Sequence, residues 1–373
     1  MTKYNFLQSY TFQNGAQVKN RIVMSPMTEK LSFENGAVTT DEMRYYQRRS
    51  GGTGMVITGC ANINDLGKGF EGELSASSEK MLSGLSSLAS AISTKGTKAI
   101  LQLSSAGRKS DSKILRGKQP ISASDIPLEN PNAETPRALT STEVEQTVQD
   151  FAKATKLAID AGFDGIEIQG GNTNLIQQFL SPASNDRTDK WGGTAEKRMN
   201  FGLAIVDVCV RVIEKYKRKP FILGYRFSVE EAHEVQGLRL AETFQMLTEL
   251  AKRPLDYLHI SLGNAWQSSQ VELENQEPLF TRCRDILPTN IALIVVGNIQ
   301  KPNEAEKVIQ AGGNFVAMGK EFIKEPFWVE KVINDDENNI RYQLDPNELE
   351  ELAIPQTLAE YLATDFSADF PLL

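Results

Sequence analysis

The sequence predicts an α/β fold, namely a (β/α)8 TIM barrel with an N-terminal β-hairpin and long strand-end loops. Three observations predict it: eight short apolar runs rich in strand formers, helix signals between most of them, and two long polar connections. Nearly continuous apolarity is typical of parallel strands buried on both faces, and eight strand–helix units close a barrel. The runs cover residues 21–25, 54–58, 99–103, 164–168, 221–226, 256–261, 291–296 and 314–318.

The clearest helix signal follows Thr140. Thr140 and Glu143 form a capping-box pattern, and apolar residues recur at helical spacing until Gly162. Pro302 opens a second helix, which ends at Gly312 directly ahead of the eighth run. These helices supply the connections that parallel strands require.

A hairpin is predicted ahead of the first strand, because Asn14-Gly15 lies between two alternating segments. We expect it to plug the bottom of the barrel. Barrels of this class hold more than about 250 residues in one domain, so 1–373 is predicted to be a single domain. Within it, 1–20 is the hairpin cap and 345–373 a C-terminal extension, read as a terminal helix with an extended end.

The two long polar connections are residues 104–139 and 169 to about 194. Each leaves the carboxyl end of a strand, where barrel enzymes keep their active sites. We therefore expect both to contribute to a lid or a pocket.

Composition excludes several classes of protein. The net charge of −8 argues against a nucleic-acid partner, and no stretch has the roughly 18 apolar residues of a membrane span. The three cysteines, Cys60, Cys209 and Cys283, fit neither a disulfide framework nor a metal motif. With no signal-peptide pattern at the N-terminus, we expect a soluble, cytoplasmic protein without a bound metal.

Polar residues at the strand ends are candidates for ligand binding. The loops after strands seven and eight often hold a phosphate in barrels, and here they contain Gly297, Asn298, Gly319 and Lys320. Glycines also end strands for purely structural reasons, so this pattern alone leaves the two interpretations even.

Two further side chains end apolar strands. Arg226 is costly in such a place unless it meets an anion. Gln102 has an amide that both donates and accepts, although a satisfied core glutamine is the alternative. His259 also lies near a strand end, where a hydrogen-bonded structural role is favoured over a catalytic one.

A series of motifs resembles the Old Yellow Enzyme family in family order from about residue 5 to 330. They are NRIVMSPMT, YYQRRSGGTGMVIT, LQLSSAGR, DGIEI, NLIQQFLSPASNDRTDKWGGTAEKRMNF, GYRFS, DYLHISLG, VVGNI and FVAMGKEFIKEP. The resemblance implies a barrel that binds flavin mononucleotide (FMN) without covalent attachment. It also implies reduction by NADH or NADPH and reoxidation by an electron-poor, small-molecule acceptor.

Family positions imply a role for each matching residue. Ser25, Pro26, Met27 and Thr28 would run along the isoalloxazine ring, with Thr28 near its O4 and N5, and Cys60 would pack near the flavin. Gln102 and Arg226 would hold the pyrimidine end, and Gly297, Asn298, Gly319 and Lys320 the phosphate. Lys320 stands where the family more often has arginine. Asn185, Arg187, Asp189, Gly192 and Gly193 match as loop-shaping residues.

The resemblance breaks down at the substrate motif after the fourth strand, which reads EIQGGNTN. Gln169 replaces the family histidine, Asn172 keeps the asparagine option, and Asn174 replaces the tyrosine that protonates the substrate. The amides of Gln169 and Asn172 can still hold an acceptor oxygen, but a carboxamide cannot act as a general acid. The catalytic set is thus predicted to be Gln169, Asn172, Arg226 and Thr28.

Two interpretations remain, and the first is favoured. The protein is an FMN-dependent oxidoreductase whose acceptor is a quinone, a flavin, oxygen, or an activated alkene protonated by water or another residue. Alternatively, it is an FMN-binding relic or sensor with little turnover. A barrel lyase or isomerase acting on a phosphorylated substrate is a weaker third option. A homodimer or higher homo-oligomer is compatible with all three.

Overall fold

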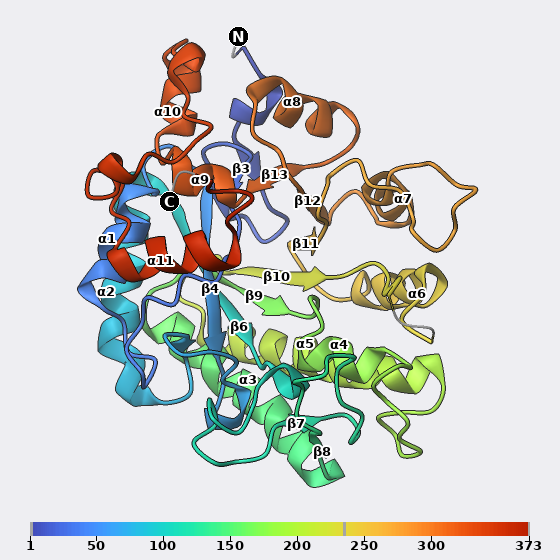
Figure 1. Cartoon of the computed structure of the whole chain (residues 1–373). Helices are drawn as coiled ribbons and strands as arrows, with labels where there is room; N and C mark the ends of the chain where they lie inside the picture. The colour runs from blue at the N-terminus through green and yellow to red at the C-terminus, as the bar shows by residue number, and fades with distance from the viewer. Residues whose placement is uncertain (1–2, 234–235, 372–373) are drawn as a thin grey trace.

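The computed structural model describes residues 3–233 and 236–371 of the chain. Its centre is a closed barrel of eight parallel strands, in the order β3-β13-β12-β11-β10-β9-β6-β4, which pairing between β3 and β4 completes (Figure 1). The barrel strands are β3 (Ile22–Met24), β4 (Met55–Asn62), β6 (Lys98–Ser104), β9 (Gly165–Gln169), β10 (Ile222–Phe227), β11 (Tyr257–Ile260), β12 (Ala292–Val296) and β13 (Phe315–Met318). Each overlaps one of the predicted apolar runs, so the predicted (β/α)8 fold is confirmed.

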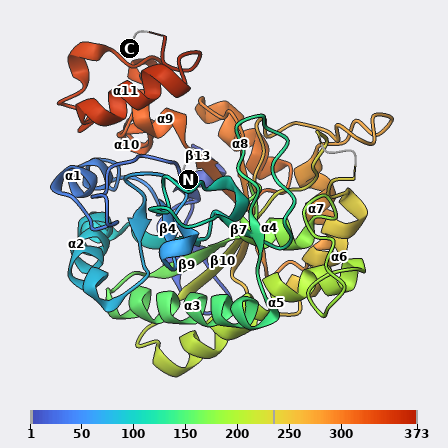
Figure 2. The same cartoon turned by 60° about the horizontal axis from the view of Figure 1, so that its bottom comes forward.

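Helices surround this barrel, as Figure 2 shows for α3, α5, α6 and α7. The α-helices are α1 (Thr40–Arg48), α2 (Leu82–Ser93), α3 (Ser141–Asp160), α4 (Leu175–Leu180), α5 (Ala195–Tyr216), α6 (Leu240–Leu250), α7 (Leu279–Ile286), α8 (Pro302–Gln310), α9 (Lys320–Lys324), α10 (Trp328–Ile333) and α11 (Gln356–Asp365). Each connection between consecutive barrel strands contains at least one of these helices, which allows the parallel arrangement.

Helix α3 begins as the sequence predicts. The Thr140 side chain accepts a hydrogen bond from the backbone N–H of Glu143 at 3.2 Å, and the Glu143 carboxylate accepts from the Thr140 N–H at 2.9 Å. This reciprocal capping box satisfies two backbone donors that the helix would otherwise leave free. Val144, Val148 and Phe151 then bury one face of the helix against the barrel.

The N-terminal hairpin fills the amino end of the barrel, as predicted. Strands β1 (Tyr10–Thr11) and β2 (Gln17–Val18) pair antiparallel across a turn in which Gly15 has a φ of 87°. Phe12 is 3% exposed and stacks on Phe315 with ring centroids 5.4 Å apart. Phe12 therefore belongs to the same apolar cluster as the inward side chains of the barrel strands.

Both long connections contain more structure than the sequence predicts. The first carries strands β7 (Ile121–Ser122) and β8 (Arg137–Ala138), which pair with each other in parallel. The second contains helix α4, whose six residues are all buried. A further short strand, β5 (Leu74–Ser75), pairs with the end of β4.

The C-terminal extension contains the predicted helix, α11, but its extended end is a wrong prediction. After Asp365 the chain turns back, with the N–H of Asp369 donating to the carbonyl of Phe366 at 2.8 Å. The turn buries Phe370, which is 1% exposed, and this burial favours it over an extended end. Figures 1 and 2 show α9, α10 and α11 together on one side of the barrel. None of the helices in the described residues is long and apolar enough to cross a membrane.

Candidate functional site

A cavity of about 170 Å³ lies at the carboxyl ends of the barrel strands. It brings together eight of the predicted site residues, which come from the ends of five different strands. These are Pro26, Met27, Thr28, Cys60, Gln102, Gln169, Asn172 and Arg226. Asn174 lines the same cavity. The motifs that the sequence separates by two hundred residues therefore meet in one place.

A buried polar network forms below this cavity. The amide of Gln102 donates to Glu167 at 2.6 Å and accepts from the thiol of Cys60 at 3.1 Å. The other carboxylate oxygen of Glu167 lies 2.8 Å from Nδ1 of His259. Gln102, Glu167 and His259 are each at most 1% exposed, so these hydrogen bonds fix the orientation of the Gln102 amide.

The charges in this network depend on one another. Burial lowers the pKa of His259, so its ring is neutral and donates through Nδ1. Burial by itself would raise the pKa of Glu167, but the contacts with His259, Arg226 and Gln102 outweigh it and hold that pKa below its usual value. Glu167 is thus a carboxylate, and it stabilises the nearby positive charge of Arg226.

Arg226 is predicted to meet an anion, and its surroundings leave room for one. Its side chain is buried, and its Nη2 donates to the hydroxyl of Ser261 at 3.1 Å. Its buried Nε has no hydrogen-bond partner among the described residues. Burial lowers the pKa of Arg226, but arginine starts so high that it remains charged. A buried cation with an unused donor faces the cavity.

One wall of the cavity follows β9. The backbone N–H of Gly171 donates to the Gln169 side-chain oxygen at 3.2 Å, and among the described residues the Gln169 NH2 group has no hydrogen-bond partner. Asn172 and Thr173 have φ values of 55° and 56°, a sharp left-handed turn that exposes Asn172. Asn174 is buried and donates to the carbonyl of Gly171 at 3.0 Å, so it supports the turn.

Sequence reasoning missed several residues that line or support the site. Glu73, Phe70 and Lys109 all line the cavity, and Glu167 lies beneath it. A carboxylate inside the apolar run DGIEI was a signal for Glu167, because such a charge needs a buried partner. Lys109 follows the matched LQLSSAGR motif directly, but nothing in the sequence shows which way it points.

The C-terminal extension also reaches the site. The ammonium of Lys30 lies 3.8 Å from the centre of the Tyr361 ring in α11, and the nearby Thr28 side chain tends to lower the pKa of the Tyr361 phenol. The phenol is partly buried, and that burial raises its pKa. Helix α11 therefore holds the loop after β3 in place.

The residues predicted to hold a phosphate do not line this cavity, although they follow β12 and β13. Gly297 has a φ of 143°, and a Cβ atom there would lie 2.4 Å from the backbone nitrogen of Ala265. Asn298 is exposed with a φ of 47°. The Lys320 ammonium forms an ion pair with Asp369 at 2.6 Å.

Two other predicted positions are set by packing. Ser25 is buried, and its backbone N–H donates to the carbonyl of Met318 at 2.9 Å. A Cβ atom on Gly319 would lie 2.8 Å from the sulfur of Met27. The glycine therefore lets the end of β13 approach the loop after β3.

The donors around the cavity fit FMN, the cofactor implied by the motif resemblance. Arg226 offers a positive charge and an Nε–H that has no partner among the described residues, and Gln102 presents an amide whose orientation the network fixes. Outside the cavity lining, Lys320 and the glycine-bordered ends of β12 and β13 would supply a cation and close backbone approach for a phosphate.

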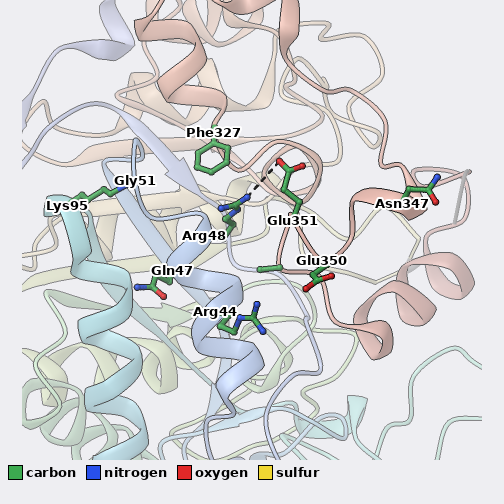
Figure 3. A pocket seen from close by; sticks show the side chains of 10 residues that line it. Arg44, Gln47, Arg48, Gly51, Lys95, Phe327, Asn347, Glu350 and Glu351 are labelled. Carbon is green, nitrogen blue, oxygen red and sulfur yellow. Dashed lines mark ion pairs between the residues drawn. The ribbon is translucent and has the colours of Figure 1, made fainter.

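A larger hollow of about 740 Å³ lies elsewhere, between α1 and the C-terminal extension (Figure 3). Arg48 of α1 and Glu351 form an ion pair across it at 3.8 Å. None of the predicted site residues lines it within the described part of the chain. Size alone therefore does not single out the cavity that brings the predicted site residues together, because it is the smaller of the two.

Comparison with known proteins agrees with these motifs. The model of the NADH:flavin oxidoreductase / NADH oxidase family matches residues 8–339. The chain is 42% identical over 364 residues to an NADH:acrylate oxidoreductase of Vibrio harveyi, covering 96% of this chain but only 36% of that protein. It is 38% identical over 351 residues to a probable NADH-dependent flavin oxidoreductase of Bacillus subtilis (strain 168), covering 94% of each.

A solved structure supports the same assignment. Morphinone reductase in complex with tetrahydroNAD superposes with a TM-score of 0.76 at 25% identity, covering 89% of this chain and 91% of that one. The resemblance to Old Yellow Enzymes is thereby confirmed. From its family match, its relatives and its barrel, the chain belongs to the NADH:flavin oxidoreductase / NADH oxidase family.

Proposed function

We propose that this protein is an FMN-dependent oxidoreductase that takes a hydride from NADH or NADPH and passes it to an electron-poor acceptor. The observation that carries the proposal is the single cavity where Thr28, Gln102 and Arg226 meet Gln169 and Asn172. Family membership and nucleotide-dependent relatives support it. We also propose that residues 1–373 fold as one domain, because one apolar cluster extends from Phe6 to Phe370.

Bound FMN would supply the hydride-transfer chemistry between the nucleotide and the acceptor. The protein's part is to bind and to stabilise charge. Arg226 and Gln102 would hold the pyrimidine edge, where the buried guanidinium stabilises negative charge that builds up on reduction. Thr28 would lie near O4 and N5 of the isoalloxazine ring. Ser25, Pro26, Met27 and Cys60 would border it, and Gly297, Asn298, Gly319 and Lys320 would hold the phosphate.

On the acceptor side, Gln169 and Asn172 would bind an oxygen atom of the acceptor through their amide NH2 groups. Asn174 occupies the position of the family tyrosine and donates to the backbone carbonyl of Gly171. Its carboxamide has no acidic proton, so it cannot protonate the substrate as the tyrosine would. We infer that the acceptor is a quinone, a flavin, oxygen, or an alkene protonated by another group.

The chain spans only 36% of the length of the Vibrio harveyi relative, so the activity of that whole protein is not assigned to this chain. That protein is named for NADH and acrylate, which is compatible with a nucleotide donor and a small electron-poor acceptor here. We propose a small-molecule acceptor and a homodimer or higher homo-oligomer.

Anaerobic stopped-flow mixing with NADH and with NADPH tests the proposal. The flavin absorbance at about 450 nm should bleach rapidly with one or both donors and return on adding a quinone or oxygen. A yellow protein that does not bleach would favour an FMN-binding relic or sensor. A colourless protein that cannot be reconstituted with FMN would refute the proposed function.

Restoring the family residues tests the role of the acceptor side. The double variant Gln169→His with Asn174→Tyr should raise the rate of enone reduction by about 100-fold or more, because general-acid transfer returns. The single variant Gln169→His is the matched control. An unchanged rate in the double variant would place the limitation elsewhere in the cavity.

A further inference from the structure

The acceptor side of the cavity contains a lysine that the proposed reaction does not use. Lys109 follows β6 in the short 3-10 turn Gly107–Lys109 and lines the cavity beside Gln169 and Asn172. Its ammonium donates to the backbone carbonyl of Asn172 at 2.9 Å. An ammonium has three donors, so two remain for another partner.

Among the described residues around Lys109, none compensates its positive charge near neutral pH. Glu73 is its nearest acidic neighbour in the cavity, but burial raises the pKa of Glu73 to about 8, so that this carboxyl is mostly protonated near neutral pH. Burial likewise raises the pKa of the Cys60 thiol to about 12 and keeps it neutral. Arg226 is matched by the buried carboxylate of Glu167.

Lys109 is an exposed residue, but its ammonium contacts the Asn172 carbonyl at the cavity, and the protein atoms around the ammonium lower its pKa by desolvation. Desolvation weakens competition from water, so an anion entering the cavity would gain more from this cation than at an open surface. The free end of the Gln169 amide lies on the same side of the cavity and offers a further donor.

We propose that Lys109 makes the acceptor pocket selective for small molecules that carry a carboxylate, with the ammonium of Lys109 pairing with that carboxylate. This inference rests on the proposed function and deepens it by naming the substrate class. An acceptor held in this way has its carboxylate at the Lys109 wall and its electron-poor group toward Gln169 and Thr28.

The alternative is that Lys109 only supports the turn at Asn172 through its hydrogen bond. Substitutions separate these roles because charge and hydrogen bonding can be changed independently. Lys109→Arg keeps the charge, Lys109→Gln keeps a donor without charge, and Lys109→Met removes both. Lys113→Met alters an exposed lysine of the same loop that does not line the cavity, and is the matched control.

The experiment is calorimetric titration of the FMN-loaded protein with benzoate and with benzamide, its neutral analogue of similar shape. The wild type and Lys113→Met should bind benzoate about tenfold more tightly than benzamide. Lys109→Met and Lys109→Gln should lose that preference, and Lys109→Arg should keep most of it. Benzoate binding should also weaken with added salt, since screening acts on the ion pair.

The pH dependence has a definite sign. Benzoate affinity should fall as pH rises through about 8, because Glu73 then ionises beside the ligand, and fall further as Lys109 loses its proton. Glu73→Gln should remove the first step only.

Three results for Lys109→Met would overturn the inference. An unchanged preference for benzoate would show that Lys109 does not bind the anion, and an equal loss of benzamide binding would show that its role is structural. A rise confined to the Michaelis constant for the nucleotide, measured by steady-state kinetics, would show that Lys109 binds the hydride donor. Failure of the protein to retain FMN or to be bleached by NADH or NADPH would instead refute the proposed function. The two claims can therefore fail separately.

Discussion

Glu167 positions two side chains at the floor of the cavity at once. One of its oxygens accepts from Gln102 and the other from His259, and its charge offsets that of Arg226. Without this carboxylate, the buried guanidinium would have no counter-charge and the Gln102 amide could rotate. The edge of the cavity formed by Gln102 and Arg226 thus depends on a residue that does not line the cavity.

Replacing Arg226 by alanine should weaken FMN binding and slow flavin reduction by at least about tenfold. The reason is that the variant removes the cation expected to stabilise reduced FMN and leaves Glu167 buried without it. Binding is measured by fluorescence titration and reduction by stopped flow. Arg211→Ala, on the exposed side of α5, should change neither. Unchanged reduction kinetics in Arg226→Ala would contradict the role.

Glu29 should make the fold less stable as pH rises. It is 5% exposed, and burial together with the neighbouring charge of Glu42 raises its pKa to about 8. Between about pH 4.5 and 8 the folded protein keeps this proton while the unfolded chain loses it, so the free energy of unfolding falls. Below that window the effect disappears, because both states are protonated.

Glu29→Gln should therefore raise the free energy of unfolding by roughly 1 to 3 kcal/mol near pH 8 and change it little near pH 5. Urea unfolding at both pH values measures this difference. Glu129→Gln, at an exposed position, is the control. A gain of equal size at both pH values would show that the proton is not responsible.

Individual residues show where sequence reasoning succeeds and where it stops. Arg187 and Asp189 were predicted to shape their loop, and they form an ion pair at 2.5 Å. His259 was predicted to be structural, and it is fully buried against Glu167. Lys109 could not be predicted, because the direction of a loop side chain depends on contacts with Asn172, which is distant in the sequence.

Among the secondary-structure elements, the C-terminal extension contacts the candidate site region at two points. Tyr361 of α11 packs against the ammonium of Lys30 in the loop after β3, and Asp369 in the following turn pairs with Lys320 at the start of α9. The second contact places a carboxylate on the lysine proposed to bind the FMN phosphate. Asp369 and the phosphate therefore compete for one cation.

Asp369→Asn should tighten FMN binding by about two- to fivefold, because the neutral amide no longer competes with the phosphate. The effect should shrink with added salt, and fluorescence titration of the apoprotein measures it. Asp365→Asn, at the exposed end of α11, should have a smaller effect. Weaker binding in Asp369→Asn would instead mean that this ion pair holds Lys320 ready for the phosphate.

Elements with strong local patterns were predictable, and those made by tertiary contacts were not. Each barrel strand has an apolar run, with polar residues mainly toward its end, and the capping box of α3 can be recognised in the sequence. Helix α4 has only six residues and no side-chain cap, so burial rather than local preference explains it. The turn at Phe370 likewise depends on a distant apolar partner surface.

At the scale of the whole molecule, the hairpin and the barrel share one core. Phe12 lies among the inward side chains of the barrel, and Asn14 of the turn donates to Asp256 at 2.9 Å ahead of β11. The hairpin is thus part of the barrel's packing rather than an appendage. The Asn14-Gly15 turn could be predicted from the sequence. The packing of Phe12 of the hairpin on Phe315 could not, because it depends on the closed barrel.

Phe12→Ala should lower the free energy of unfolding by about 3 to 5 kcal/mol, because it leaves a cavity in this core. Flavin reduction should be unaffected in the protein that remains folded, since Phe12 lies at the opposite end from the proposed site. Chemical denaturation measures the first effect and stopped flow the second. Phe33→Ala, at a side chain that is 60% exposed, should cost far less.

The filled amino end of the barrel restricts how the two reactants can reach the cavity. Because Phe12 and its neighbours close the amino end of the barrel, reactants can approach the proposed flavin only from the carboxyl end, where Gln169 and Asn172 lie. The hydride donor and the acceptor would then bind one after the other from the same end of the barrel. We expect the nucleotide and the acceptor each to inhibit binding of the other at high concentration. The ratio of their concentrations in solution would then control the rate of turnover.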